Sequence, residues 1–311
     1  MAKHFNSKVL ANGKPLNRMN DVFAKFIFAN EARKDLTLDL INSVFELDGT
    51  KEIVDFDFRD RELDSNREDG RGIVLDVTGK CSDGTLVNVE FQLHKLDGME
   101  QRMLYYWSLL YGRRLVRSEE YTALNHTVVI SILAYRLFDD EVWPHYHSSF
   151  AVLNTKDMNH KLTDDLEIHF VELPKWKRKP VSEMSRLERW MAYLSPRTTD
   201  EERGQLAMVD NAIETAMEAE NVFVASPEYL TAYERYEKRV RDEAAMKSAA
   251  RKDGIAIGEA RGEAKGRRAE RNKLIIKLHN AGMSNAEIAG LVEADESEVA
   301  SVIRKGEAAV N

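Results

Sequence analysis

Apolar residues recur at three- and four-residue steps over residues 22–44, and this spacing predicts helical structure with one wide apolar face. The polar stretch 30–34 interrupts the pattern and divides the segment into two helices. Asn20 or Asp21 precedes the first apolar residue, and either side chain can cap the first helix. After a polar start, the chain is therefore expected to open with a pair of helices.

Strand patterns follow these helices. Residues 52–58 predict a strand, and residues 59–72 predict a polar loop. The stretch 73–78 is almost continuously apolar, as in a central strand that is covered on both faces. The stretch 85–93 alternates instead, which places every second side chain on the same face. A Ser-Asp-Gly turn lies between the last two stretches and makes them neighbours in a hairpin.

The middle of the chain continues to mix helix and strand patterns. Residues 98–117 predict an amphipathic helix and residues 126–135 a buried strand. Residues 166–173 predict a strand whose alternation is consistent with an edge position. Helical patterns then continue from residue 185 to the end. Strands flanked by helices predict an α/β domain of roughly 150–240 residues, followed by an all-helical C-terminal tail.

The tail differs from the rest in composition. Glycines recur at a strict four-residue step, at Gly254, Gly258, Gly262 and Gly266. Each weakens a helix by about 1 kcal/mol relative to alanine, so either a close-packed partner helix compensates or the segment is a flexible polar linker. We expect three parts: a main domain over residues 1–240, a charged helical linker over 241–272 and a small helical module over 273–311.

The module has the outline of a helix-turn-helix. Gly282 can end its first helix, and Ser284 with Glu287 forms a capping box for the second. The third helix begins with Glu296 and Glu298, whereas a helix that reads DNA carries basic or amide side chains there. Packing or oligomerisation therefore stands beside DNA reading as a role for the module.

Composition limits the class of protein. The 311-residue chain has one cysteine, Cys81, so no intrachain disulfide can form and a reducing compartment is expected. The N-terminus lacks the apolar core of a signal peptide, and no apolar run has the length needed to span a bilayer. We therefore expect a soluble cytoplasmic protein with no membrane association. The formal net charge of -8 weakens a nucleic-acid interpretation without excluding it, because phosphate contacts need clustered cations.

Two neighbouring predicted strands each carry one acid, Asp76 and Glu90. For either acid alone, a salt bridge or an exposed edge position is the ordinary explanation, because a buried carboxylate needs a partner. Together the two acids can converge on one point, and Gln92 projects to the same face as Glu90. Two such carboxylates, with water and a phosphate, suit Mg²⁺, which takes oxygen ligands and few of them from protein.

This spacing, Asp76-x13-Glu90-x-Gln92, resembles the PD-(D/E)XK nuclease signature, in which Asp is followed by Glu-x-Lys on the next strand. The closer resemblance is to the PD-(D/E)XK family transposases and recombination-promoting nucleases of bacteria, the Rpn family. That resemblance covers most of the chain and rests on residues 20–28, 40–45, 75–92, 101–115 and 119–133. It implies a restriction-endonuclease-like core, with a mixed sheet flanked by helices. It also implies metal-dependent DNA breakage that promotes recombination, with Mg²⁺ as cofactor and Mn²⁺ as a substitute.

The resemblance also assigns roles to individual residues. It makes Asp76 and Glu90 the metal-binding acids and places Gln92 where the signature has lysine. Glutamine lacks the positive charge of lysine, and Lys80 or Lys95 are candidates to supply that charge from elsewhere.

Further residues are candidate DNA contacts. Gln101 and Tyr105 have the Gln-x-x-x-Tyr spacing of RecB-type relatives, where such a pair lies near the site and the DNA backbone. A basic stretch contributes Lys175, Lys177 and Arg178. These cations would contact phosphate while Trp176 stacks on a base, unless the stretch is simply a solvated charge run.

Two other features keep alternative explanations. Asp21 is a further site acid if it does not serve as the helix cap. His145 and His147 have ligand-like spacing, but no clear set of cysteines or carboxylates accompanies them.

We therefore predict a Mg²⁺-dependent DNA endonuclease in which Asp76, Glu90 and Gln92 carry the chemistry. A transposase that acts on a defined DNA structure is the enzymatic alternative. The non-enzymatic alternative is a catalytically weak protein that keeps the nuclease fold and binds DNA or self-associates through its C-terminal tail. The missing lysine and the acidic net charge favour this last possibility.

Overall fold

The computed structural model describes residues 5–10, 13–59, 62–63, 73–112, 120 and 124–308; for 62–63, 73–74 and 306–308 it describes the backbone only. These residues form two compact units, residues 1–238 and residues 239–311. Each unit is described separately below. The predicted loop over 59–72 and the end of the predicted helix over 98–117 fall largely outside the described residues.

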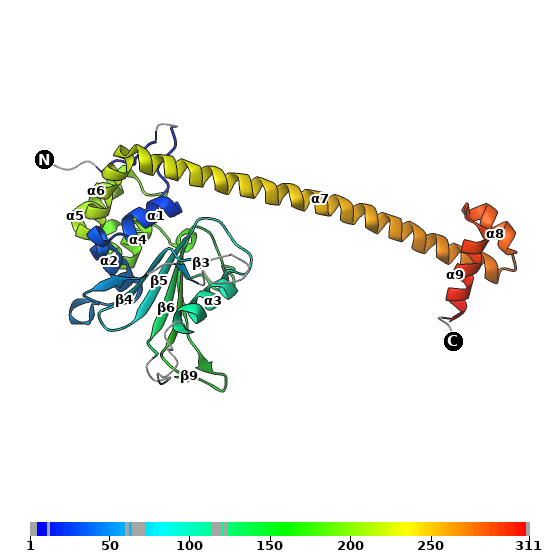
Figure 1. Cartoon of the computed structure of the whole chain (residues 1–311), viewed down its shortest axis with the longest axis horizontal. Coiled ribbons are helices and arrows are strands. Elements are labelled where there is room, and N and C mark those ends of the chain that lie inside the picture. Colours follow the sequence, from blue (N-terminus) through cyan, green and yellow to red (C-terminus); the bar gives the residue numbers. More distant parts are fainter. Residues whose placement is uncertain are drawn as a thin grey trace. The chain divides into compact units, whose positions relative to one another are not determined.

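The first unit is built around a mixed six-stranded sheet in the order β1-β4-β5-β6-β10-β7 (Figure 1). The strands β5, β6 and β10 run parallel, and the remaining neighbours pair antiparallel. Short pairs β2–β3 and β8–β9 lie outside this sheet. The strand bounds are β1 Phe56–Phe58, β2 Glu62–Leu63, β3 Ile73–Val74, β4 Val77–Cys81, β5 Leu86–Gln92, β6 Thr127–Leu133, β7 His147–Phe150, β8 Leu153–Asn154, β9 Asp157–Lys161 and β10 Leu166–Glu172.

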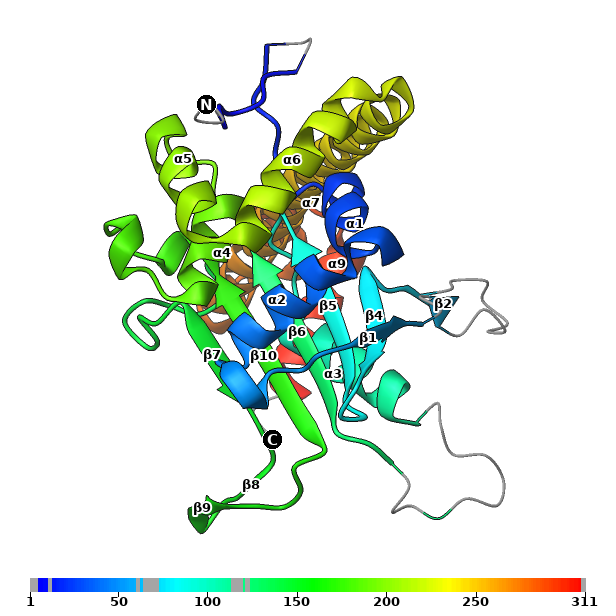
Figure 2. The ribbon, with the colours of Figure 1, turned by 90° about the vertical axis from the view of Figure 1, so that its left-hand side faces the viewer.

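Helices cover both faces of the sheet, with α3 on one face and the other helices of this unit on the opposite face (Figure 2). The helix bounds are α1 Asp21–Phe28, α2 Lys34–Val44, α3 Met99–Gly112, α4 Arg186–Leu194, α5 Asp200–Val209, α6 Asn211–Ala225, α7 Pro227–Asn280, α8 Asn285–Val292 and α9 Glu296–Ala308, with 3-10 turns η1 Glu31–Arg33, η2 Gly49–Lys51, η4 Leu173–Lys175 and η5 Val181–Glu183. The predicted α/β class, a mixed sheet flanked by helices with a helical C-terminal region, is confirmed.

Alternation along the strands explains the two layers. Val87, Val89 and Phe91 of β5 pack in the larger core, with α1, α2, α4 and α6. Side chains at the intervening positions point to the α3 face, where the smaller core contains Met99 and Met103 of α3. The intervening positions of β5 thus carry Asn88, Glu90 and Gln92 to the α3 side, and the sequence correctly predicted that they share one face.

The opening helices form where the pattern predicts them. Asn20, and not Asp21, caps α1, because its side-chain oxygen accepts the Val22 backbone N–H at 3.0 Å. Phe23 and Ile27 of α1 are fully buried, so the helix is fixed against the sheet. The 3-10 turn η1 separates α1 from α2 at the predicted interruption.

Three details of the sheet differ from the prediction. The strand β10 lies between β6 and β7 and is not at an edge. Its polar positions, which suggested solvent on one face, instead meet other polar side chains inside the fold. The strand expected over 52–58 is confined to β1, and the strands β7 to β9 were not predicted because their sequences lack regular apolar alternation.

A buried ion cluster joins the N-terminal segment to the helical layer. Glu220 of α6 accepts from Arg18 Nε at 2.6 Å and from an Arg203 guanidinium nitrogen of α5 at 2.8 Å. All three side chains are buried. Such a cluster is held by mutual pairing, because an unpaired charge would be costly at this depth.

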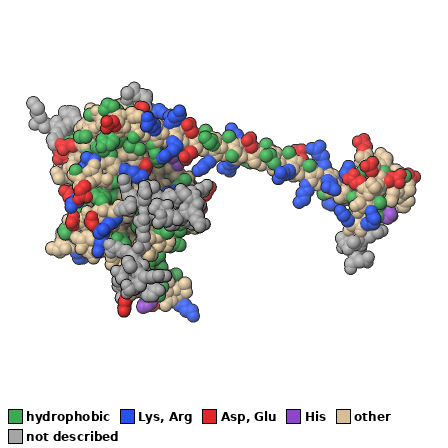
Figure 3. All heavy atoms as spheres, viewed as in Figure 1, with side chains coloured by type: hydrophobic (Ala, Val, Ile, Leu, Met, Phe, Trp, Pro, Cys, Tyr) green, Lys and Arg blue, Asp and Glu red, His purple; other side chains and the backbone are tan. Residues whose placement is uncertain are grey.

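The second unit contains most of α7, together with α8 and α9. Ile275, Ile288 and Val299 are fully buried between these three helices. The predicted capping box of Ser284 and Glu287 begins α8, and Gly282 takes a positive φ of 91° after the end of α7. Lys and Arg side chains are spread along α7, as Figure 3 shows. No helix in the described part of the chain is long and apolar enough to cross a membrane.

Candidate active site

Asp76 and Glu90 lie opposite one another at one end of the β4–β5 hairpin. Val77 pairs with Val89, so Asp76, one residue before β4, lies beside Glu90. The sequence predicted one continuous strand over residues 73–78, but β3 ends at Val74 and the chain bends at Asp76 before β4 begins. This bend removes Asp76 from the regular ladder and leaves its side chain available to contact β5.

Hydrogen bonds fix both carboxylates. Asp76 Oδ2 accepts the Phe91 backbone N–H at 3.0 Å. Glu90 Oε1 accepts the Asp76 backbone N–H at 3.2 Å and Asn88 Nδ2 at 3.0 Å. The residues Asp76 and Glu90 are only 6% and 1% exposed, so these contacts orient two acids that are nearly shielded from solvent. Asn88, which the sequence interpretation did not single out, is part of this arrangement.

Gln92 completes the strand side of the site. It lies two positions after Glu90 on β5 and is half-buried. Its Nε2 lies 3.4 Å from Glu90 Oε2, a long hydrogen bond that leaves this oxygen able to accept a further donor or a cation. The three residues predicted to carry the chemistry are therefore brought together.

The helix α1 adds a cation that the sequence interpretation missed. Lys25 Nζ lies 2.9 Å from Asp76 Oδ1 and 2.7 Å from Asp21 Oδ1. Asp21 thus belongs to the neighbourhood of the site, one helical turn before Lys25. The sequence pattern offered only the regular i,i+4 spacing of Asp21 and Lys25, which is common on exposed helices and does not indicate a contact with Asp76.

Burial shifts the protonation of both strand acids. Burial raises the pKa of Glu90, and the nearby charge of Asp76 raises it further. Burial likewise raises the pKa of Asp76, although Lys25 opposes the rise. In the metal-free fold each acid therefore favours its protonated form more than a solvated carboxyl group does. A bound cation would favour the ionised form of both.

The donor atoms fit a hard divalent cation. The site offers carboxylate oxygens, which Mg²⁺ and Mn²⁺ prefer, and Glu90 Oε2 retains capacity to accept. Among the residues described, no three His, Cys, Asp or Glu side chains form a group that could hold a metal. Mg²⁺ suits two protein carboxylates nonetheless, because it keeps several waters and binds substrate phosphate.

The helix α3 borders the site on the face of the sheet to which Glu90 and Gln92 point. The predicted DNA contacts, Gln101 and Tyr105, are both exposed on this helix. Tyr106, between them and the sheet, is buried, and its hydroxyl accepts Arg102 Nε at 2.7 Å. The positive charge of Arg102 lowers the pKa of Glu90, against the larger effects of burial and Asp76. Arg102 is thus a second cation near the acids that sequence reasoning did not identify.

The basic stretch after β10 is largely committed to internal pairs. Lys175 is buried, with its Nζ 2.9 Å from Glu172 Oε2 and 2.6 Å from the Trp143 backbone oxygen. Arg178 forms a bidentate pair with Glu202 of α5. Trp176 is also buried, at 4% exposure, and so cannot stack on a base in this conformation. Lys177 is exposed.

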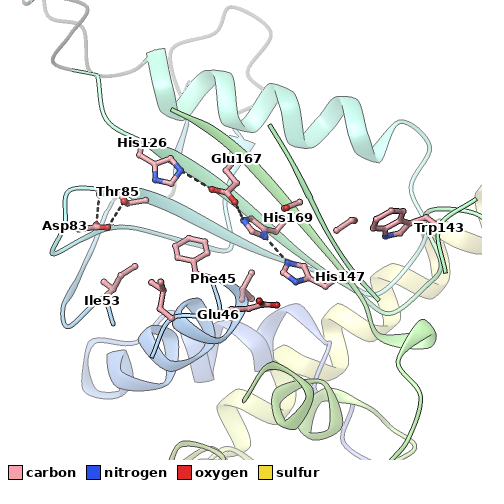
Figure 4. A pocket seen from close by; sticks show the side chains of 14 residues that line it. Phe45, Glu46, Ile53, Asp83, Thr85, His126, Trp143, His147, Glu167 and His169 are labelled. Carbon is pink, nitrogen blue, oxygen red and sulfur yellow. Dashed lines mark hydrogen bonds and ion pairs between the residues drawn. The ribbon is translucent and has the colours of Figure 1, made fainter. Parts of the chain in front are cut away.

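A second polar cluster lies on the opposite face of the sheet, in a pocket of about 580 Å³ (Figure 4). Glu167 bridges two imidazoles there, 3.3 Å from His126 Nε2 and 3.0 Å from His169 Nε2. His169 Nδ1 in turn lies 2.9 Å from His147 Nε2. His147 therefore pairs with a histidine of β10, whereas His145 lies exposed beside Trp143. These contacts explain the polar alternation of β10.

Comparison with known proteins identifies the family. A model of the PD-(D/E)XK nuclease family transposases matches residues 18–250, a span that includes α1, both strand acids and α3. No curated protein and no solved structure matches the chain significantly. Because the matched residues make up most of the chain and contain the site described above, the chain belongs to the PD-(D/E)XK nuclease family transposases.

Proposed function

We propose that this protein is a metal-dependent DNA endonuclease, which hydrolyses phosphodiester bonds and thereby promotes DNA breakage and recombination. The observation that carries the proposal is the pair of buried acids, Asp76 and Glu90, oriented toward one another by backbone N–H groups in a chain of this family. The ion pair with Lys25 accounts for Asp76 but leaves the buried Glu90 without a cation of its own in direct contact among the described residues, so stability alone does not explain the pair of acids.

Asp76 and Glu90 would hold Mg²⁺, or Mn²⁺ as its substitute. When bound, the ion would lower the pKa of a water molecule and neutralise charge on the phosphate. The chain's own contribution is orientation: the Phe91 N–H holds Asp76, and Asn88 holds Glu90. The amide of Gln92, beside Glu90 Oε2, is placed to orient the attacking water or a phosphate oxygen.

The open side of the site indicates where DNA would approach. Lys25 and Asp21 retain about a quarter of their side-chain exposure, at 24% and 22%, and Gln92 is half-buried. We propose that the scissile phosphate enters past these residues. Gln101 and Tyr105, exposed on α3, would support the DNA backbone, and Lys177 would add a phosphate contact at a distance.

The C-terminal helices are proposed to serve self-association. Glu296 and Glu298 begin α9, where a DNA-reading helix would carry basic residues, and Glu298 pairs with Arg271 of α7. We expect sedimentation to show fewer chains per particle for the chain truncated near residue 245 than for the full chain. An unchanged state of association would contradict this role.

Digestion of supercoiled plasmid tests the proposed activity. We expect cutting with Mg²⁺ or Mn²⁺, none with EDTA, and loss of cutting in Asp76→Asn and Glu90→Gln. Glu141→Gln, which removes an exposed acid elsewhere, is the matched control and should cut normally. Cutting that needs no metal would favour the binding or oligomerising alternative. Cutting by both site variants at the wild-type rate would favour it too. Defined ends instead of scattered nicks would favour a structure-specific transposase.

A further inference from the structure

Lys25 occupies a position between the candidate acids and solvent. Its Nζ lies 2.9 Å from Asp76 Oδ1, and Asp21 Oδ1 holds the same ammonium group at 2.7 Å. The helix that carries it is anchored by the buried side chains of Phe23 and Ile27 and by the Asn20 cap. The ammonium is therefore delivered by a fixed element and is held at two points.

The strand position that carries lysine in the PD-(D/E)XK signature is Gln92, which is neutral. The other cations near the hairpin do not fill the gap. Lys80 lies at the far end of β4, four residues from Asp76. The charge of Arg102 acts on Glu90 without an ion pair to either acid among the described residues, and its Nε donates to the Tyr106 hydroxyl. Among the side chains that the structure describes, Lys25 is the cation in direct contact with a candidate metal-binding acid.

We propose that Lys25, from α1, supplies the positive charge that the signature places on the strand, and that it is a positioning residue for the scissile phosphate. The inference rests on the proposed nuclease function. In the metal-free protein Lys25 neutralises Asp76. With a divalent cation on the acids, the Lys25 ammonium would turn toward the exposed rim, where Asp21 would hold it in reach of a phosphate oxygen. Neither Lys80 nor Lys95 is needed for this role.

This arrangement predicts opposite effects on metal binding and on turnover. Lys25 competes with a divalent cation for Asp76, because both positive charges need the same carboxylate. Removing the ammonium should therefore strengthen cation binding while it weakens the stabilisation of the phosphate. A residue that only maintained the fold would weaken both.

The test uses the full chain and the variant Lys25→Met. Ca²⁺ binding by calorimetry reports on the acids without cleavage, and single-turnover plasmid cutting with Mg²⁺ reports on the reaction. We expect Lys25→Met to bind Ca²⁺ several-fold more tightly and to cut roughly 100-fold more slowly. Lys34→Met is the matched control, because it removes a lysine that pairs with Asp55 at 2.7 Å and has similar exposure, 35% against 24%. It should match the wild type in both measurements.

The double variant Lys25→Met/Gln92→Lys returns the charge to the strand position and should recover a large part of the lost rate. Wild-type cutting by Lys25→Met, or joint loss of Ca²⁺ binding and cutting without recovery in the double variant, would overturn the inference. Failure of the wild type to cut DNA with any metal would overturn the proposed function instead. In that case Ca²⁺ affinity still tests whether Lys25 competes with a cation for Asp76. Tighter Ca²⁺ binding by Lys25→Met would support that competition, and equal or weaker binding would refute it.

Discussion

Replacing Glu90 by glutamine should stabilise the metal-free protein, although Glu90 lies in the centre of the candidate site. The substitution keeps the size of the side chain and removes its charge. The glutamine oxygen can still accept from the Asp76 N–H and from Asn88, which bond Glu90 Oε1 at 3.2 and 3.0 Å. Its new NH₂ group would meet the Gln92 amide, which can rotate to present its oxygen.

The expected gain follows from the cost of ionising Glu90 in the fold. Burial, with the charge of Asp76, raises the pKa of Glu90 from 4.5 to about 8. Because the folded value is the higher one, the carboxyl group supports the fold fully below about pH 4.5 and loses that contribution as pH rises toward 8. One pKa unit corresponds to about 1.4 kcal/mol, so at pH 7 the wild type forgoes roughly 3 kcal/mol that Glu90→Gln retains.

Thermal unfolding in EDTA, followed by tryptophan fluorescence, measures this difference. All four tryptophans, Trp107, Trp143, Trp176 and Trp190, lie in the first unit, so the signal reports on the domain that holds the site. A gain of roughly 3 kcal/mol should raise the Tm of Glu90→Gln by roughly 6–12 °C at pH 7. The gain should shrink as pH falls and approach zero below about pH 4.5, and Glu141→Gln should show none. A lower Tm, or a difference that does not change with pH, would refute the reasoning.

Three further predictions concern protons and buried charge. Since both strand acids have raised pKa values, Mg²⁺ binding near neutral pH should release protons. The binding heat measured by calorimetry should therefore vary with the ionisation heat of the buffer. Equal binding heats in all buffers would argue against the site. Burial, with His169 nearby, lowers the pKa of His147 to about 4, so the wild type should lose stability as pH falls from 6.5 toward 4. In urea titrations, His147→Gln should make the free energy of unfolding depend less on pH over this range. An unchanged pH dependence would count against the role of His147. Glu220→Gln should destabilise the first unit by about 3–5 kcal/mol, because Arg18 and Arg203 would remain buried without their carboxylate; a loss under about 1 kcal/mol would show that the cluster rearranges.

The sequence is sufficient to predict the features that depend on local spacing. The alternation of residues 85–93 correctly placed Glu90 and Gln92 on one face, and the Ser284 capping box correctly began α8. The family resemblance, with its mixed sheet flanked by helices, is likewise confirmed. These features need only a residue's neighbours along the chain, which the sequence displays directly.

Features that depend on distant contacts were not predictable in this way. Lys25 reaches Asp76 from a helix far earlier in the chain, and its spacing from Asp21 has an ordinary local explanation. The interior position of β10 was hidden because Glu167 and His169 looked like solvent-facing residues, whereas they pair with histidines from other segments. In both cases the partner, and not the pattern, decides the environment of the side chain.

Mn²⁺ binding monitored by electron paramagnetic resonance tests the metal assignment most directly. Titration of the wild type, Asp76→Asn, Glu90→Gln and the control Glu141→Gln would compare their affinities under the same conditions. The structure predicts one tight ion per chain for the wild type and the control, and weakened binding in both site variants, with Glu90→Gln folded at least as stably as the wild type. Equal Mn²⁺ binding by all four proteins would show that the two acids do not hold the metal.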